Sequence, residues 1–351
     1  MPIFRSDEAD NLTREANTAR QQRAPAHVDS VKSKMQELRR IKQELREVRT
    51  EALTAKDWAE RTEHNKKKKT IQQKIFRLER ELRATEEGRA GDTPVTGALP
   101  DFVIIGAQKC GTTFLYHLLA QHPLVEPAAS KELHFFDKNF DLGVEWYRQC
   151  FPVARWEDGH GTISGEATPY YMFHPLAAER MVEVVPKARL IALLRNPVDR
   201  AYSHHQQEAR KGDEPLSFEE AIEAEEGRLC GERNRMLEDK KYASFEHQRL
   251  SYLSRGIYVD QLLRWSELYA REQLLVLKSE DFFENPLGSL ESVLGFLGLP
   301  EWEPTPSELG NRRHEGRYEG GLDPVLRGRL EEYFEPHNRR LYDFLGEDLG
   351  W

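Results

Sequence analysis

The sequence predicts an α/β fold of the P-loop-like, three-layer type. Its central sheet is expected to be mostly parallel, and an α-helical coiled-coil or helical-hairpin segment precedes it. Three observations predict this arrangement. Apolar, strand-like runs alternate with helical patterns after residue 100, which is typical of parallel α/β sheets. The first of these runs leads through a glycine-containing loop into a helical pattern. Apolar residues at 3–4 spacing come earlier in the chain and predict long helices there.

The first hundred residues contain two apolar stripes with helical spacing. The first comprises Val31, Leu38, Ile41, Leu45, Val48 and Ala52, and the second comprises Ile71, Ile75, Leu78 and Leu82. The stripes are out of register, because Val48 and Ile71 are 23 residues apart, about two more than three heptads. We therefore expect two helices folded as a hairpin, with a break within residues 56–69, rather than one continuous coiled coil. Self-association through residues 28–90 is a hypothesis for either arrangement.

Composition sets the expected domain limits. Residues 1–27 are polar and show no helical or strand period, so we expect a flexible N-terminus there. Residues 28–90 form the helical coiled-coil or hairpin segment. Residues 91–100 belong to a stretch rich in glycine and proline that is typical of a linker. Residues 101–351 form the α/β domain.

Length and composition restrict the class of protein. With 351 residues, 38% of them hydrophobic, the chain can bury one large core plus an appendage. No apolar run approaches about 18 residues and the first residues lack the apolar core of a signal peptide, so we expect no membrane span. The three cysteines, Cys110, Cys150 and Cys230, lack metal-ligand spacing. We therefore expect a soluble, cytoplasmic protein of a reducing compartment, without a metal site.

The charge is divided unevenly along the chain. Residues 1–100 carry 22 basic and 17 acidic side chains, a net charge of +5. The remaining residues carry 29 basic and 43 acidic side chains, a net charge of −14. An acidic domain argues against non-specific binding of nucleic acid, so we expect no nucleic-acid partner.

The apolar pattern of the α/β domain predicts its elements in order. Strands are expected at residues 102–105, 162–165, 189–194 and 274–277, and helices at residues 176–185, 198–210, 259–269 and 287–297. A further helix is marked by Phe114, Leu115, Leu118 and Leu119. Ligands of such sheets bind beyond the carboxyl ends of the strands. The segments that follow residues 105 and 194 are therefore the expected places for a site.

The segment Gly106–Thr113, GAQKCGTT, has the composition of a phosphate-binding loop between a strand and a helix. Such a loop presents free backbone N–H groups and the positive end of a helix to an anion, and Lys109 adds a charge inside it. The segment departs from the loop of nucleotide triphosphatases, because Thr112 stands where their lysine follows the second glycine. Lys109 is placed to reach a 5′-phosphate or a bridging oxygen rather than a β/γ-phosphate. A plain strand-to-helix turn is the alternative.

The strand at residues 189–194 leads into Arg195 rather than into the acidic residue with which a P-loop NTPase positions Mg²⁺. An arginine at a strand end, with Ser203 two helical turns further on, suits a second phosphate. The alternative is a structural ion pair between Arg195 and Asp199.

These residues resemble the 3′-phosphoadenosine 5′-phosphosulfate (PAPS)-dependent sulfotransferases, in the branch that contains the heparan-sulfate-type enzymes and many bacterial relatives. Gly106–Thr113 is similar to the 5′-phosphosulfate loop of that family, and Arg195–Ser203 is similar to its 3′-phosphate loop. Further similar segments are Lys131–Asp137 (KELHFFD), Gly165–Tyr171 (GEATPYY), Arg255–Tyr258 (RGIY) and the tail Leu330–Trp351. The resemblance spans roughly residues 100–351 and does not cover residues 1–95.

The resemblance implies transfer of a sulfuryl group from PAPS to a hydroxyl or amine of a carbohydrate or small-molecule acceptor. The reaction needs no metal and releases adenosine 3′,5′-bisphosphate (PAP). The resemblance implies that Lys109 stabilises the leaving phosphate, and that Glu132 is the base, with His134 as the rival base or an orienting partner. The residues implied in cofactor binding are Gln108, Lys109, Cys110, Gly111, Thr112, Thr113, Arg195, Ser203, Tyr258 and Arg317. Glu166 is expected to be mainly structural.

Two positions depart from the family pattern. Ala167 stands where many heparan-type relatives carry a lysine, so a charge contribution to the sulfuryl group is missing from that side. Glu315-Gly316-Arg317 stands where the family has a Lys-Gly-Arg loop that closes over the cofactor, so the first charge is reversed and Arg317 is kept.

The acceptor is expected to bind under residues 204–254, which include Arg210 and the acidic run Glu219–Glu226. A solvated helical cover is the alternative interpretation of this segment. The acidic domain favours a neutral glycan, an alcohol or an amine over a strongly anionic polymer such as heparan sulfate. Two other functions remain: a P-loop kinase or NTPase, opposed by Thr112 and Arg195, and an inactive coiled-coil scaffold. The scaffold is opposed by the joint presence of Lys109, Glu132, Arg195 and Ser203.

Overall fold

The computed structural model describes most of the C-terminal part of the chain and scattered positions of the N-terminal part. The described residues are 33–44, 47, 48, 51, 60, 63, 67, 70, 71, 74, 78, 97–152, 156, 157, 160–305, 309 and 321–351. The chain divides into two compact units, Met1–Pro94 and Val95–Trp351. The predictions for residues 1–27, for most of the break within 56–69 and for Arg317 lie outside the described residues.

Both apolar stripes of the N-terminal unit contribute to one buried cluster. Residues 33–44 are helical, as are the described positions between 47 and 78. Ile41 and Val48 of the first stripe are buried together with Ile71 and Leu78 of the second, and Leu38 packs against them. The 3–4 spacing therefore marks a buried face. The hairpin and its self-association stay predictions.

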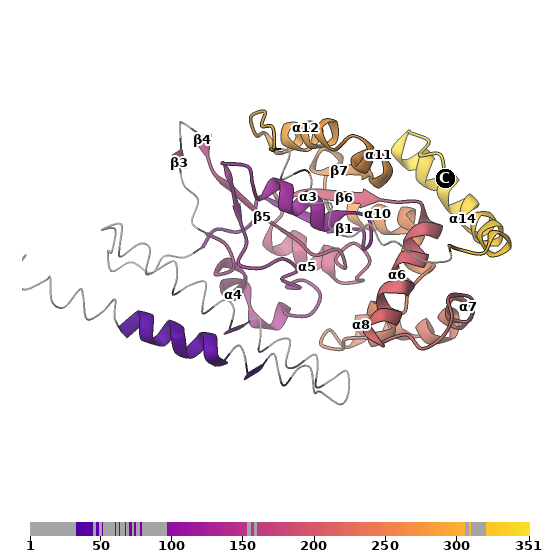
Figure 1. Cartoon of the computed structure of the whole chain (residues 1–351), viewed down its shortest axis with the longest axis horizontal. Helices are drawn as coiled ribbons and strands as arrows, with labels where there is room; N and C mark the ends of the chain where they lie inside the picture. Colours follow the sequence, from indigo (N-terminus) through magenta and orange to yellow (C-terminus); the bar gives the residue numbers. More distant parts are fainter. Residues whose placement is uncertain are drawn as a thin grey trace, which may run out of the picture. The chain divides into compact units, whose positions relative to one another are not determined.

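The C-terminal unit is an α/β domain in which strands and helices alternate (Figure 1). Its strands are β1 (Phe102–Gly106), β2 (Val125–Pro127), β3 (Trp156–Glu157), β4 (His160–Gly161), β5 (Ile163–Ala167), β6 (Arg189–Leu194) and β7 (Leu274–Lys278). Its helices are α3 (Thr112–Leu119), α4 (Val144–Arg148), α5 (Ala177–Val184), α6 (Pro197–Lys211), α7 (Phe218–Leu229), α8 (Glu232–Glu238), α9 (Phe245–Arg249), α10 (Tyr258–Ser266), α11 (Ser279–Glu284), α12 (Pro286–Leu297) and α14 (Pro324–Leu345).

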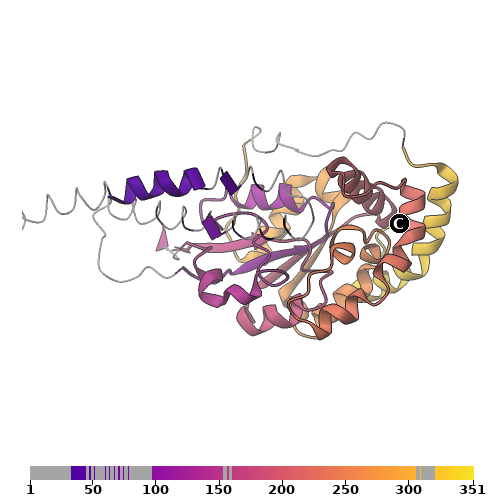
Figure 2. The ribbon, with the colours of Figure 1, turned by 90° about the horizontal axis from the view of Figure 1, so that it is seen from below.

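The strand β1 lies at the centre of a five-stranded parallel sheet of order β2-β5-β1-β6-β7. Helices α3 and α12 lie on one side of this sheet and α5 on the other (Figures 1 and 2). The expected α/β fold with a central parallel sheet is confirmed. Because the strands are parallel, the segments that follow β1, β5, β6 and β7 meet at one edge of the sheet, where ligands of such folds bind.

Close packing inside the sheet requires a glycine in β5. Gly165 pairs with Phe102 of β1, and a Cβ atom at Gly165 would lie 2.5 Å from carbons of the Phe102 ring. Phe102 is fully buried and cannot move aside without disturbing the core. The glycine thus lets β5 approach β1 closely.

Helix α6 begins immediately after β6 because its first residues stop the strand and cap the helix. The side-chain oxygen of Asn196 accepts hydrogen bonds from the N–H groups of Val198 (3.0 Å) and Asp199 (3.3 Å), and Pro197 occupies the first helical position. Gly212, with φ of 76°, ends the helix. The geometry of this junction fixes the direction in which Arg195 leaves the sheet.

Most expected elements are found with small shifts of their ends. The four predicted strands correspond to β1, β5, β6 and β7, and the predicted helices correspond to α3, α5, α6, α10 and α12. The sequence did not predict β2 or the short β3–β4 pair. In the part of the chain that the structure describes, no helix combines the length and apolar character that crossing a membrane requires.

Candidate active site

A cleft of about 560 Å³ opens at the carboxyl ends of the strands. Its lining from the loop after β1 and the start of α3 is Gln108, Lys109, Gly111, Thr112, Thr113 and Phe114. Its other lining residues are Lys131, Glu132, His134, Pro169, Tyr170, Arg195, Ser203, Gln207, Arg210, Lys211, Gln248, Arg249, Arg255 and Phe283. Residues that the sequence predicted from three separate segments therefore share one cleft.

The loop after β1 opens the amino end of α3 toward this cleft. Gly111 has φ of 92° and is the residue before the helix, where its left-handed conformation favours glycine. No side chain caps the helix, and its first turn holds no acidic residue. The first N–H groups of a helix are anion-binding donors when no side chain caps them. This start of α3 is therefore suited to a phosphate group.

Lys109 lies in the same loop with φ of 73°, a conformation that non-glycine residues rarely adopt. Burial lowers the pKa of Lys109 to about 8, and the neighbouring charges of Arg210, Lys211 and Arg195 add to this effect. A cation in such surroundings is stabilised strongly by an anion that enters the cleft. Lys109 is thus placed and tuned to respond to negative charge.

Arg195 and Ser203 line the cleft from the end of β6 and from α6. The alternative of an ion pair between Arg195 and Asp199 is not what the structure shows, because Asp199 pairs with Arg327 of α14. The backbone around Arg195 is fixed on both sides. Tyr258 Oη donates to the Arg195 carbonyl oxygen (2.8 Å), and the N–H of Asn196 donates to Glu280 (2.9 Å).

Among the described residues, two that are implied in cofactor binding do not line the cleft. Cys110 is fully buried, and its Sγ lies 3.9 Å from Tyr258 Oη. Burial raises the pKa of the Cys110 thiol to about 11, so the side chain is a neutral core group. Tyr258, also buried, supports the backbone at Arg195 from below. Both positions shape the site from the inside of the domain.

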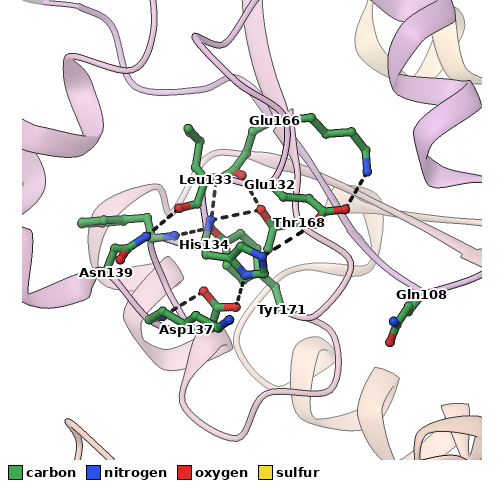
Figure 3. A network of polar contacts seen from close by, with 12 residues as sticks. Gln108, Glu132, Leu133, His134, Asp137, Asn139, Glu166, Thr168 and Tyr171 are labelled. Carbon is green, nitrogen blue, oxygen red and sulfur yellow. Dashed lines mark hydrogen bonds and ion pairs between the residues drawn. The ribbon is translucent and has the colours of Figure 1, made fainter. Parts of the chain in front are cut away.

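The segment with Glu132 and His134 is held at the end of β5. The N–H of Glu132 donates to the Ala167 carbonyl oxygen (3.1 Å), and the N–H of His134 donates to Thr168 Oγ1 (3.4 Å). Both residues have positive φ, 58° for Glu132 and 52° for His134. Such strained positions cluster at functional sites. Figure 3 shows this network, with Asp137 on the far side of His134.

The side chains of this segment form a chain of polar contacts. His134 Nδ1 lies 2.5 Å from Asp137 Oδ2, and its Nε2 lies 3.7 Å from Glu132 Oε2. Lys131 Nζ lies 2.8 Å from Glu132 Oε1. Partial burial by itself would raise the pKa of Glu132, but His134 and Lys131 together hold the pKa below its usual range. Burial would also raise the pKa of Asp137, but the neighbouring His134 lowers it to about 2.

Glu166 is a carboxylate of a different kind. It is fully buried, and its oxygens accept hydrogen bonds from the hydroxyls of Tyr147 (2.7 Å), Thr168 (2.7 Å) and Tyr171 (3.0 Å). Burial raises its pKa. Tyr171 also accepts the N–H of Phe135 (2.7 Å), so this buried network supports the segment that carries Glu132 and His134.

Basic side chains dominate the cleft, which the sequence did not predict. Seven lining residues are basic (Lys109, Lys131, Arg195, Arg210, Lys211, Arg249 and Arg255) and one, Glu132, is acidic. Lys211 and Arg249 share the buried carboxylate of Glu208, at 2.8 and 3.4 Å. Arg210 and Lys211 follow Ser203 by about two turns of the predicted helix, and this spacing could have indicated that they lie on the same side as Ser203. Nothing in the spacing indicated Arg249.

Comparison with known proteins identifies the family of this chain. A family model described as "Sulfotransferase domain" matches residues 99–309, and a solved structure of a sulfotransferase from Alicyclobacillus acidocaldarius is 31% identical. The chain belongs to the PAPS-dependent sulfotransferases. The structural match covers 72% of this chain and 98% of that chain, with a TM-score of 0.55.

Two curated relatives of this sulfotransferase are heparan sulfate enzymes. Human heparan sulfate glucosamine 3-O-sulfotransferase 3B1 is 30% identical over 275 residues, which cover 72% of this chain and 65% of the relative. Bifunctional heparan sulfate N-deacetylase/N-sulfotransferase 1 of Caenorhabditis elegans is 29% identical over 273 residues, which cover 71% of this chain and 30% of the relative. The sulfotransferase therefore spans less than two thirds of the length of these relatives.

Proposed function

We propose that this sulfotransferase moves a sulfuryl group from PAPS to a hydroxyl or amine of a carbohydrate or small-molecule acceptor and releases PAP. One observation carries the proposal. Residues of the loop Gly106–Thr113, the arginine after β6 and residues of the segment Lys131–His134 line one cleft. A donor nucleotide and an acceptor base would therefore face each other across a single space.

The donor set of the cleft fits a nucleotide with two phosphate groups. The start of α3 and the loop before it would hold the 5′-phosphate, and Arg195 with Ser203 would hold the 3′-phosphate. The excess of basic lining side chains supports both assignments. Arg317, which lies outside the described residues, is proposed as a further phosphate ligand on the sequence alone.

Lys109 is proposed to stabilise the oxygen that joins the phosphate to the sulfuryl group. PAPS supplies a sulfur–oxygen bond that breaks while the acceptor oxygen or nitrogen forms a new bond to sulfur. Negative charge then grows on the phosphate side. Because burial and neighbouring cations disfavour charged Lys109 in the free cleft, growing negative charge stabilises that residue more in the transition state than before it.

Glu132 is proposed to accept the proton that leaves the acceptor. Its side chain is 46% exposed and lines the cleft, so an acceptor can reach it. The low pKa of Glu132 makes it a weak base toward a free hydroxyl. We therefore expect the proton to move as the acceptor attacks sulfur. His134, held by Asp137 through Nδ1, would orient Glu132 through Nε2.

The test is release of PAP from PAPS in the presence of a panel of glycans, alcohols and amines, with and without a metal chelator. Glu132→Gln should lower turnover by about 10²-fold, the size typical of a lost general base. Glu145→Gln is a matched control, because Glu145 is 72% exposed and does not line the cleft. Metal-dependent binding of ATP without binding of PAP would contradict the proposal and favour a kinase or NTPase.

A further inference from the structure

Arg255 is a buried cation beneath the cleft. It is 2% exposed, and among the described residues no carboxylate forms an ion pair with it. Its Nη2 donates to the carbonyl oxygens of His247 (3.0 Å) and Gln248 (2.8 Å). Its guanidinium lies over the rings of Tyr170 (5.1 Å) and Phe173 (5.0 Å). A buried charge without a carboxylate partner destabilises the folded protein unless other groups compensate it, so every hydrogen bond of the guanidinium matters.

The remaining contact of Arg255 is with the loop after β1. Arg255 Nη1 donates to Oε1 of Gln108. A guanidinium can only donate, so the atom of the Gln108 amide that meets it must be the oxygen. The orientation of the amide is therefore fixed by chemistry, and Nε2, with its two N–H groups, is the opposite end. No other hydrogen bond of this side chain is found in the described part of the structure, and Gln108 lines the cleft.

Gln108 lines the same cleft as the proposed phosphate donors and Glu132. It precedes Lys109, whereas the proposed phosphate donors at the start of α3 follow Lys109. The segment with Glu132 is attached to Ala167 at the end of β5, which pairs directly with β1. Figure 3 shows Gln108 apart from the network that contains Glu132 and His134, and all three residues line the cleft. In-line transfer requires the sulfuryl group to lie between the leaving phosphate and the attacking acceptor atom, which Glu132 is proposed to deprotonate.

We propose that Gln108 donates a hydrogen bond from Nε2 to the sulfuryl group of PAPS, and that Arg255 is a positioning residue that fixes this donor. The inference rests on the proposed function and adds to it, because it names a side chain that recognises sulfuryl rather than phosphate. It predicts that a change at Gln108 weakens the binding of PAPS, which carries the sulfuryl group, more than the binding of PAP, which lacks it.

The experiment compares the dissociation constants of PAPS and PAP, measured by titration calorimetry without acceptor. Gln108→Leu should weaken PAPS binding about tenfold, the effect of one hydrogen bond to a charged group, and change PAP binding less than about twofold. Gln108→Glu should weaken PAPS binding further, because the carboxylate still meets Arg255 but offers no donor. Arg255→Met should change the ratio of the two constants in the same direction.

The matched control for Arg255 is Arg264. Its Nη2 also contacts backbone carbonyl oxygens, those of Met172 (3.5 Å) and Phe173 (3.3 Å), but Arg264 does not line the cleft. Arg264→Met should leave the ratio of the PAPS and PAP constants unchanged. If Arg255→Met does not fold, the two Gln108 variants decide alone, because Gln108 is a partly exposed loop residue.

The possible results separate this inference from the proposed function. Equal weakening of PAPS and PAP in the Gln108 variants would overturn the inference, since it would make Gln108 a phosphate ligand or a loop support. Unchanged PAPS binding by Gln108→Glu would overturn it as well. Absence of PAP binding by the wild-type protein would instead overturn the proposed function.

Discussion

The cleft and the domain that carries it have opposite charge. Residues 101–351 have a net charge of −14, whereas the side chains that line the cleft include seven basic residues and one acidic residue. The field at a site is set mainly by groups within about one Debye length, roughly 8–10 Å, and not by the sum over a domain. The net charge of the domain therefore gives no argument against an anionic acceptor, and the cleft itself is suited to anions.

Several acidic residues of the domain lie behind the cleft or on the outer surface. Glu208 is buried behind the cleft, where it holds Lys211 and Arg249. Glu225 accepts hydrogen bonds from the backbone N–H groups of residues 252, 253 and 254, just before Arg255. These carboxylates support the basic lining from inside the domain and leave the cleft surface to cations. Acidic residues such as Glu219 lie on the outer surface, 54% exposed.

The largest effect is expected at Lys109. Lys109→Ala should lower the turnover of PAPS by about 10²–10³-fold, because it removes a cation from the position where negative charge grows. The measurement is the initial rate of PAP release at saturating PAPS. Lys187→Ala is the control, since Lys187 is exposed and lies outside this cleft. A Lys109→Ala variant that kept turnover within threefold would remove Lys109 from the mechanism.

Glu166 represents the acidic residues inside the domain, because its carboxylate supports the site but does not line the cleft. Glu166→Ala should lower the free energy of unfolding by about 3 kcal/mol, because three buried hydroxyls lose their acceptor. Glu166→Gln should cost less, since the amide oxygen can still accept and no buried charge remains. Urea denaturation measures both. Equal losses in the two variants would show that the negative charge, rather than hydrogen bonding, is what the network needs.

The charge of the cleft should depend on pH through Lys109. Its pKa in the free protein is about 8, and a bound phosphate raises it, so binding above about pH 8 must take up a proton. The affinity for PAP should fall by only about twofold between about pH 7 and 8, where phosphate no longer titrates and Lys109 begins to lose its proton. It should then fall by at most about tenfold per pH unit. Lys109→Arg should remove this dependence, because arginine stays charged. A flat profile in the wild type would contradict the assignment.

The smallest effect is expected on the outer surface. Glu219→Gln should change the affinity for PAP by less than about twofold, because Glu219 is exposed, pairs with Arg329 and does not line the cleft. Calorimetric titration at low and at physiological salt measures it. A gain above fivefold at physiological salt would mean that the net charge of the domain does act on the cleft.

Much of the fold could be predicted from the sequence, because buried parallel strands are apolar runs and their helices have a clear period. The exceptions have physical reasons. The strand β2 has three residues and ends in Pro127, so it lacks a recognisable run. The helices of residues 204–254 were expected only in general terms, and the apolar face of α7 is completed by residues of α6 and of α14, which lies far along the chain.

The sequence was enough to identify many residues of the site, but it did not predict how they are arranged. Lys109, Glu132 and His134 were identified from motifs, but their positive φ values are set by tertiary contacts such as the bond from Glu132 to Ala167. The pairing of Asp199 with Arg327 joins residues 128 positions apart, which no local pattern indicates. For the same reason the basic lining, gathered from four segments, was not visible in the sequence.

The most direct test of the central claim is calorimetric titration with PAP in the presence of a chelator, on wild type, Arg195→Ala and Arg189→Ala. The two arginines flank the same strand: Arg189 begins β6, and Arg195 follows its carboxyl end at the cleft. The wild type should bind PAP without metal, Arg195→Ala should weaken binding about 10–100-fold, and Arg189→Ala should bind as the wild type does. No binding by the wild type, or equal losses in the two variants, would contradict a cleft built for a bisphosphate.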